Sequence, residues 1–332
     1  MLSRRGVLRA VSAGLIAAPL AARAQQAARI RRVGLLIPFA ESDLATQTQI
    51  AAFLEALQAL GWNEGQNVRF DYRWAAQDPA RIRGSAKELV ELQPDVILTR
   101  TTPVTAALKD ETHTIAIVFV VVSDPVGDGL VASVARPAGN VTGFTNVDAS
   151  LGGKWLQLLN EIAPRLKRIA FMFDPRMAPG GGAFYRRLIE DAAPSIGVQV
   201  IATPVHDATD IKRAIEEFAR GANGGLVVLP DVTTINHRRT TIALVAQHRL
   251  PAIYPTDYFA KEGGLISYGA DYLDLYRKAA SYVDRILRGA RPAELPVQGP
   301  IKFQLAINLK TAKALGLTIP PALLLQADQV IQ

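Results

Sequence analysis

The sequence lacks cysteine, and this absence excludes several kinds of chemistry. None of the 332 residues is a cysteine, so disulfides, thiolate nucleophiles, iron–sulfur clusters and thiolate zinc sites are excluded. A lipoprotein anchor is excluded for the same reason, because its lipid is attached to a cysteine. Any chemistry of this chain must therefore use other side chains.

Long hydrophobic runs are absent as well. The apolar run at residues 10–22 is shorter than the roughly 20 residues that span a bilayer, and no later run is longer. It follows a basic stretch and precedes Ala22-Arg23-Ala24, a small–x–small cleavage pattern. We predict a secretory signal peptide over residues 1–24, cleaved after Ala24, and a periplasmic mature chain.

The basic stretch bears on the export route and on the charge. Ser3-Arg4-Arg5-Gly6-Val7-Leu8-Arg9 resembles a twin-arginine signal, with an ordinary secretory signal as the alternative.

The whole chain carries a formal charge of +7, and four arginines without an acid lie in residues 1–24. Subtracting these four leaves +3 for residues 25–332, too little to indicate a nucleic-acid partner.

The recognisable constellations of enzymes are also missing. There is no Gly-x-Ser-x-Gly motif, and the glycine clusters at residues 127–129 and 180–182 match neither a dinucleotide fingerprint nor a phosphate loop. The histidines lack metal-ligand spacing: His113, His206, His237 and His248. We therefore expect no enzymatic activity, no cofactor and no metal.

Short apolar runs alternate with segments of helical periodicity. Apolar residues recur at helical spacing in residues 50–60, 151–162 and 272–287. The runs between such segments are continuous, which is typical of parallel strands buried on both faces. They are Val33–Ile37, Val96–Leu98, Ile115–Val122, Ile169–Phe173, Leu226–Leu229 and Ala252–Tyr254. The pattern predicts a doubly wound α/β fold.

This pattern occurs twice. Residues 31–38 and 167–175 both consist of a basic pair, an apolar strand and a proline. Later in each half a strand ends at a threonine pair, Thr101-Thr102 in the first half and Thr233-Thr234 in the second. The sequence therefore predicts two similar α/β lobes in series.

Polar and aromatic residues follow the predicted strands, where open α/β sheets bind ligands. Thr101 and Thr102 precede Pro103 and predict a helix N-terminus that could hold a ligand carboxylate. Asp124 or Asp231 could then hold an ammonium group. An apolar or aromatic side chain of the ligand could stack on Phe39, Tyr254 or Tyr268. Helix capping and turn formation are the alternative roles of the polar residues.

Several longer stretches resemble the solute-binding proteins of ABC transporters, in a group related to tryptophan- and tyrosine-type binding proteins. The resemblance covers nearly all of the mature chain. It is carried by residues 123–133, 136–145, 263–269, 276–280, 295–298 and 308–317.

The resemblance implies a type I periplasmic-binding fold, in which three crossovers join two doubly wound α/β lobes around a ligand cleft. We expect the crossovers near Thr145–Asp148, Ser267–Ala270 and Arg291–Glu294. The first lobe would comprise residues 28–146 and 267–292, and the second residues 147–266 and 293–332.

The resemblance also implies a function and a set of residues facing the cleft. The chain would capture a small polar ligand, with an amino acid, and an aromatic one in particular, as the candidate. It would deliver this ligand to a membrane permease, and its partners would be this permease and, through the permease, an ATPase. The alternatives are a sensor or receptor protein and a secreted α/β enzyme. The expected cleft residues are Phe39, Thr101, Thr102, Ser123, Asp124, Asn146, Asp174, Asp231, Tyr254 and Tyr268.

One prediction concerns the threonine pair. If the helix N-terminus at Thr101 and Thr102 holds an anionic group of the ligand, a Thr101→Ala/Thr102→Ala variant stays folded and loses ligand affinity. Calorimetric titration beside the wild-type chain measures this. Unchanged affinity would contradict the assignment.

Overall fold

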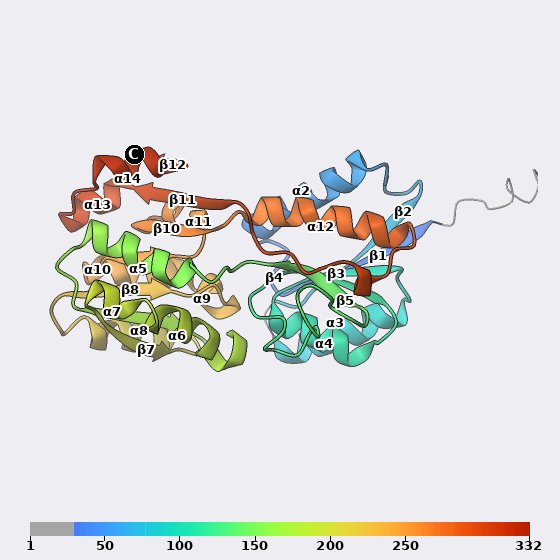
Figure 1. Cartoon of the computed structure of the whole chain (residues 1–332), viewed down its shortest axis with the longest axis horizontal. Coiled ribbons are helices and arrows are strands. Elements are labelled where there is room, and N and C mark those ends of the chain that lie inside the picture. The colour runs from blue at the N-terminus through green and yellow to red at the C-terminus, as the bar shows by residue number, and fades with distance from the viewer. Residues whose placement is uncertain (1–29, 77) are drawn as a thin grey trace, which may run out of the picture.

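The computed structural model describes residues 30–76 and 78–332, which form two α/β lobes side by side (Figure 1). One lobe contains a five-stranded sheet and the other a seven-stranded sheet, and the predicted pair of α/β lobes is thereby confirmed. The predicted signal peptide lies outside the described residues. Within them, no helix is long and apolar enough to cross a membrane.

The first lobe is built on a parallel sheet with strand order β2-β1-β3-β4-β5. Its strands are β1 (Arg31–Ile37), β2 (Val68–Trp74), β3 (Val96–Arg100), β4 (Ala116–Val122) and β5 (Val141–Thr145). Every residue of β3, β4 and β5 is buried, which explains their continuous apolar sequences.

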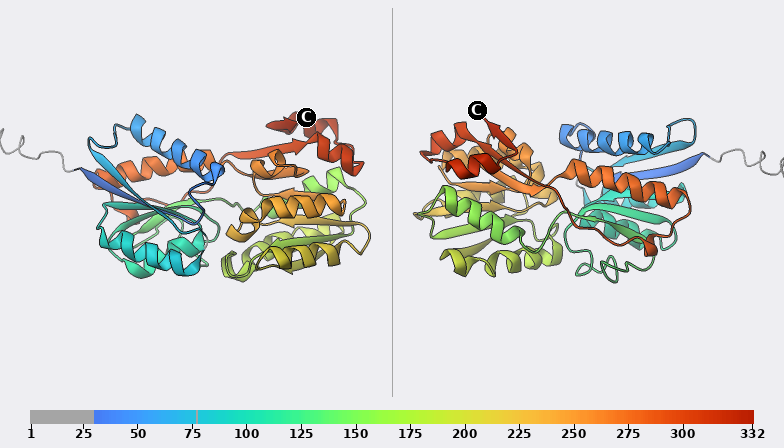
Figure 2. Two further views of the ribbon diagram at one scale, coloured as in Figure 1. Left: turned by 180° about the vertical axis from the view of Figure 1, so that it is seen from behind. Right: turned by 45° about the horizontal axis from the view of Figure 1, so that its top comes forward.

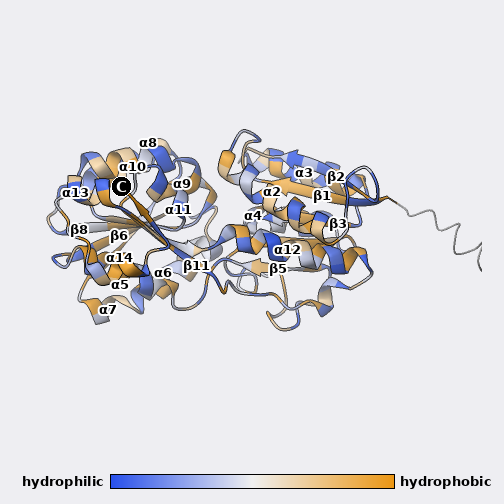
Figure 3. Cartoon of the chain, turned by 90° about the horizontal axis from the view of Figure 1, so that it is seen from above, coloured by the Kyte–Doolittle hydropathy of each residue, from blue (hydrophilic) through white to orange (hydrophobic). Residues whose placement is uncertain are grey.

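Helices cover both faces of this sheet. One face packs against α2 (Leu44–Ala59) and α12 (Tyr272–Leu287), and the other against α3 (Pro79–Glu91) and α4 (Thr102–Glu111). Along these helices hydrophobic and hydrophilic residues alternate (Figure 3), as expected for helices with one face on a sheet. Asp43 caps α2 by accepting a hydrogen bond from the Thr46 amide.

The second lobe is built on a sheet with strand order β12-β11-β10-β9-β8-β6-β7, in which only β10 and β11 pair antiparallel. Its strands are β6 (Arg168–Phe173), β7 (Gln199–Pro204), β8 (Gly224–Val228), β9 (Ala252–Tyr254), β10 (Ile266–Ala270), β11 (Phe303–Asn308) and β12 (Gln329–Ile331).

This sheet is also covered on both faces. One face carries α5 (Leu151–Ile162), α6 (Ala183–Glu190), α7 (Ala193–Ile196), α13 (Leu309–Leu315) and α14 (Pro321–Gln326). The other carries α8 (Ala208–Phe218), α9 (Val232–Asn236), α10 (Arg238–Gln247) and α11 (Asp257–Lys261). Two short 3₁₀ helices, η1 (Pro179–Gly182) and η2 (Pro292–Glu294), complete the described elements.

The chain passes between the lobes three times (Figure 2). The first passage follows β5. The second follows β10, because Ser267–Ala270 pair with β9 and β11 and thus belong to the second sheet, a few residues beyond the predicted boundary. The third follows Gln298, whose amide and carbonyl are hydrogen-bonded to β5, so it also lies later than Arg291–Glu294.

Candidate functional site

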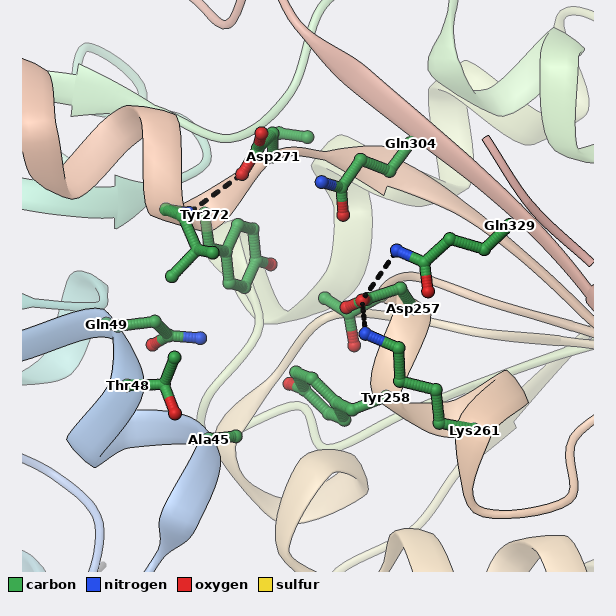
Figure 4. Close-up of a pocket in the computed structure, with 13 residues that line it drawn as sticks. Ala45, Thr48, Gln49, Asp257, Tyr258, Lys261, Asp271, Tyr272, Gln304 and Gln329 are labelled. Carbon is green, nitrogen blue, oxygen red and sulfur yellow. Dashed lines mark hydrogen bonds and ion pairs between the residues drawn. The ribbon is translucent and has the colours of Figure 1, made fainter. Parts of the chain in front are cut away.

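Two adjoining cavities lie between the lobes. The smaller, of about 220 Å³, is enclosed by α2 of the first lobe and by α11, β11, β12 and the β10–α12 passage (Figure 4). The larger, of about 570 Å³, lies between the β1–α2 segment and helices α10 and α11. They share four lining residues: Ala45, Thr48, Tyr258 and Lys261. Because both lobes contribute walls, a bound molecule would contact both.

The walls combine aromatic rings with polar side chains. The rings of Tyr258 and Tyr272 border the smaller cavity, and Phe39 borders the larger. Asp257 accepts hydrogen bonds from Lys261 and, at 3.3 Å, from Gln329 (Figure 4). Amides and hydroxyls supply further polar groups: Thr48, Gln49, Thr256 and Gln304. Such a lining suits a small molecule that is partly polar and partly apolar.

Arg100 is the most unusual buried group near these cavities. It ends β3, is 1% exposed, and its guanidinium lies 4.6 Å from the ring centre of Phe39 and 5.2 Å from that of Tyr272. Nη1 donates a hydrogen bond of 2.6 Å to Gln49 Oε1. In the described part of the chain, neither Nε nor Nη2 has a hydrogen-bond partner. Sequence reasoning missed Arg100, although a charge ending an apolar strand was a usable signal.

A buried chain of hydrogen bonds joins the lobes through one passage. Ser123, after β4, donates to Asn146 Oδ1 at 2.9 Å and is bonded to the Tyr185 hydroxyl of α6 at 2.7 Å. Asn146 Nδ2 in turn donates to the Tyr272 hydroxyl at 3.5 Å. Burial raises the pKa of both Tyr185 and Tyr272, so both hydroxyls stay protonated. Two sequence-predicted residues, Ser123 and Asn146, therefore meet at the seam between the lobes.

Two further contacts cross the seam on either side of this chain. Arg238 of α10 lies 3.5 Å from the Asp43 carboxylate at the start of α2. On the other side, the Gly180 amide donates to Asp128 Oδ1 at 3.2 Å. The lobes are thus in contact around the cavities.

The two predicted carboxylates of the second lobe lie together and have partners in the protein. Asp174 accepts hydrogen bonds from Arg176 and from the Thr233 hydroxyl. Asp231 accepts from the backbone amides of Asp174 and Thr234 and thereby caps α9. Burial raises the pKa of Asp231 to about 7, although these backbone bonds act in the opposite direction. Both carboxylates therefore serve the local fold of the second lobe.

The threonine pair begins α4, as predicted, but neither threonine side chain caps it. Thr101 has a φ of 71°, unusual for a β-branched residue, and its Oγ1 is buried with no hydrogen-bond partner among residues 30–76 and 78–332. The Thr102 hydroxyl lies near Asp128 and lowers its pKa, although burial leaves that pKa raised overall. Asp124 is engaged with the Gly127 amide. A carboxylate of the protein thus lies where a ligand carboxylate was predicted.

The two tyrosines predicted to face the ligand do not border these cavities. Tyr254 is 1% exposed and stacks on Phe259 in the core, with ring centres 4.9 Å apart. Tyr268 stacks on Phe303 at 5.5 Å and borders a hollow beside α5 and α7. Both belong to strands whose alternation directs these rings toward the covering helices. Tyr258 and Tyr272 are the aromatic residues that the structure brings to the seam instead.

No metal site is found in the described chain. Among its residues, no group of three or more His, Asp or Glu side chains could hold a metal ion.

The fold and the position of the cavities define a class of protein. Two doubly wound lobes, joined by three passages around an interlobe cavity, are the architecture of type I periplasmic-binding proteins. The chain belongs to the ABC transporter substrate binding protein family, whose model matches residues 37–331. This is a family of non-enzymatic binding proteins, typically extracytoplasmic, that bind small molecules for ABC transporters.

Individual relatives bind aromatic amino acids. The chain is 25% identical over 268 residues to a tyrosine-binding protein of Clostridioides difficile, covering 80% of this chain and 75% of the relative. A Streptococcus pneumonia ABC domain in complex with L-Trp has 23% identity and a TM-score of 0.84, over 91% of this chain and 99% of that one. A conserved domain protein from Vibrio cholerae has 29% identity and also a TM-score of 0.84, over 91% and 100%.

The raised pKa of Asp231 predicts a pH dependence of stability. The folded chain keeps a proton on Asp231 that the unfolded chain releases between about pH 4 and pH 7, so ionisation there favours unfolding. Asp231→Asn removes this titration and still caps α9. We expect the stability of the wild type, relative to Asp231→Asn, to fall as pH rises through this window. The loss is up to roughly 1.4 kcal/mol per pH unit.

Urea denaturation of both chains at several pH values measures this difference. Because the substitution also changes packing, only the change of the stability difference with pH is diagnostic, not its absolute size. A stability difference that stays constant from pH 4 to pH 7 would contradict the account.

Proposed function

We propose that this chain is the periplasmic solute-binding component of an ABC importer, and that it captures an amino acid, with an aromatic one favoured. The observation that carries this proposal is the pair of cavities whose walls come from both lobes. A ligand there becomes part of the contact between the lobes, as a transport receptor requires.

The lining supports an amino acid as the ligand. The rings of Phe39, Tyr258 and Tyr272 offer stacking surfaces for an aromatic side chain. The polar groups beside them can hydrogen-bond the charged end of the molecule. The relatives point the same way, since one is a tyrosine-binding protein and another is in complex with L-Trp.

Closure of the lobes links binding to transport. The contacts Asp43–Arg238, Asp128–Gly180 and Ser123–Tyr185 all cross the seam, so they form together only when the lobes approach. A ligand that touches both lobes favours this state through its differential affinity. We propose that the closed form is the one presented to the permease and its ATPase. The arrangement is also more similar to the L-Trp complex than to a ligand-free, open Clostridium difficile protein, with TM-scores of 0.84 and 0.69.

A thermal-shift screen of the mature chain tests this function. Amino acids, nucleobases, sugars and carboxylates are tested separately, because a ligand that binds only the native state raises its stability by about 2.7 kcal/mol at a hundredfold excess over Kd. We expect aromatic amino acids to raise the melting temperature and to be recovered unchanged. A ligand consumed during the assay would contradict a receptor function, as would a flat screen of protein shown by mass spectrometry to carry no co-purified ligand.

A pair of tyrosine variants tests the position of the site. Tyr258 borders both cavities, whereas Tyr268, on the same lobe, borders neither. We expect Tyr258→Ala to weaken binding of the ligand about tenfold or more, because an aromatic contact and its buried area are lost. Tyr268→Ala should leave the affinity nearly unchanged. The reverse result in titration calorimetry would place the ligand outside these cavities.

A further inference from the structure

We propose that Arg100 is the anion-binding residue of the interlobe site and that the ligand is therefore a carboxylate, held by a side-on pair of hydrogen bonds. This inference deepens the proposed function and rests on it. It also differs from the sequence-based prediction, which gave the ligand carboxylate to the N-terminus of α4.

The free atoms of Arg100 are those of one bidentate face. Nη1 is bonded to Gln49, whereas Nε and Nη2 have no partner in the chain over residues 30–76 and 78–332. The N–H bonds of Nε and Nη2 run parallel on one edge of the guanidinium, which matches the two oxygens of a carboxylate. The edge of the guanidinium that would bind an anion is thus the edge whose N–H groups have no hydrogen-bond partner.

Arg100 forms no direct ion pair in the described chain, although the Asp43 carboxylate, which lies 3.5 Å from Arg238, is near enough to act on it electrostatically. Its side chain is among the largest fully buried ones. Its neighbours are rings and an amide: Phe39, Gln49 and Tyr272. A guanidinium remains charged at all ordinary pH values, and an unpaired buried charge is costly. An arriving carboxylate would remove that cost, so the site discriminates in favour of anionic ligands.

The residues that touch Arg100 also border the cavities. Gln49 and Tyr272 line the smaller cavity and Phe39 lines the larger. Tyr258, which lines both, acts on Arg100 electrostatically. The hydroxyl of Tyr276, one helical turn after Tyr272, is buried and likewise without a hydrogen-bond partner in the described chain. Arg100 opposes the effect of burial on the Tyr276 pKa, which shows how near the two groups lie. Arg100 and Tyr276 themselves border neither cavity, so a carboxylate has to pass Gln49 and Tyr272 to reach them. The unpaired donors there would be Nε, Nη2 and the Tyr276 hydroxyl, which itself interacts with Arg100.

The site at α4 is a weaker candidate for the same carboxylate. Asp128 lies beside Thr102 there, and its negative charge would repel a second anion. The carboxylate that acts on Arg100, Asp43, forms no ion pair with it and lies beside Arg238 instead. The two assignments make opposite predictions for two sets of variants, so one experiment separates them.

Matched ligand pairs measure the contribution of the carboxylate. L-Tyrosine and L-tryptophan are compared by calorimetry with their carboxamides, and simple carboxylic acids with their primary amides, with neutral sugars alongside. For the wild-type chain we expect the acid of a pair to bind about 100-fold more tightly than its amide. In Arg100→Gln the ratio of acid affinity to amide affinity should fall to about threefold or less. Arg100→Lys should give an intermediate ratio, because lysine keeps the positive charge but loses the paired N–H groups of the guanidinium.

Two control variants accompany them. Arg277 of α12 is exposed and borders neither cavity, so Arg277→Gln should keep the 100-fold ratio if the effect is local to Arg100. Thr101→Ala/Thr102→Ala should also keep it. A ratio lost in the threonine variant and kept in Arg100→Gln would overturn the proposal in favour of α4.

A measurement without ligand excludes a merely structural role. Because Arg100→Met removes an unpaired buried charge and retains an apolar stem, the empty variant should melt at the wild-type temperature or above it. It should also lose the stabilisation by the acid. A variant that melts far below the wild type, or one that keeps the acid-over-amide preference, would overturn the proposal.

The outcomes for the wild-type chain separate this inference from the proposed function. If neutral sugars or amides bind as tightly as any acid, the receptor function stands and the role of Arg100 is refuted. If no member of the panel binds to ligand-free protein, the proposed function fails and this inference fails with it.

Discussion

The parallel direction of the strands is the constraint on which the rest of the structure depends. In parallel sheets, the segments that follow neighbouring strands emerge on one edge, and here those edges of both sheets meet at the seam. Ser123, Asp174 and Asp231 follow β4, β6 and β8, so they gather there without being near in sequence. The passages after β5 and β10 leave from the same edges, which places the joints of the molecule beside its cavities.

This arrangement buries polar groups between two bodies that can separate. Within each lobe such groups find partners, as Asp174 does with Arg176 and Thr233. At the seam, some polar groups find their partner only in the opposite lobe, as Ser123 does in Tyr185. For Nε and Nη2 of Arg100, neither lobe supplies a hydrogen-bond partner. An unpaired buried polar group is costly in free energy. A ligand that hydrogen-bonds to such a group therefore stabilises the closed form and makes binding specific for ligands of matching chemistry.

The sequence predicted the architecture better than the site. Continuous apolar runs indicated parallel strands such as β3 and β4, and two of the residues predicted to face the ligand, Ser123 and Asn146, are hydrogen-bonded to each other at the seam. The face of the sheet on which a ring lies depends on its position along the strand, and Tyr254 lies against Phe259 in the core rather than at the cavities. The sequence shows Arg100 as a charge at the end of an apolar strand. It does not show that Nε and Nη2 lack hydrogen-bond partners, because that depends on three-dimensional packing. The late passages at Asp271 and Gln298 likewise depend on pairing with distant strands.

A crystal structure of the chain grown with the aromatic amino acid that stabilises it most would test the central claim most directly. The account predicts density for the ligand between α2 and α11, in contact with residues of both lobes and bordered by Tyr258 and Tyr272. Density confined to one lobe, or to the outer hollow beside Tyr268, would contradict it.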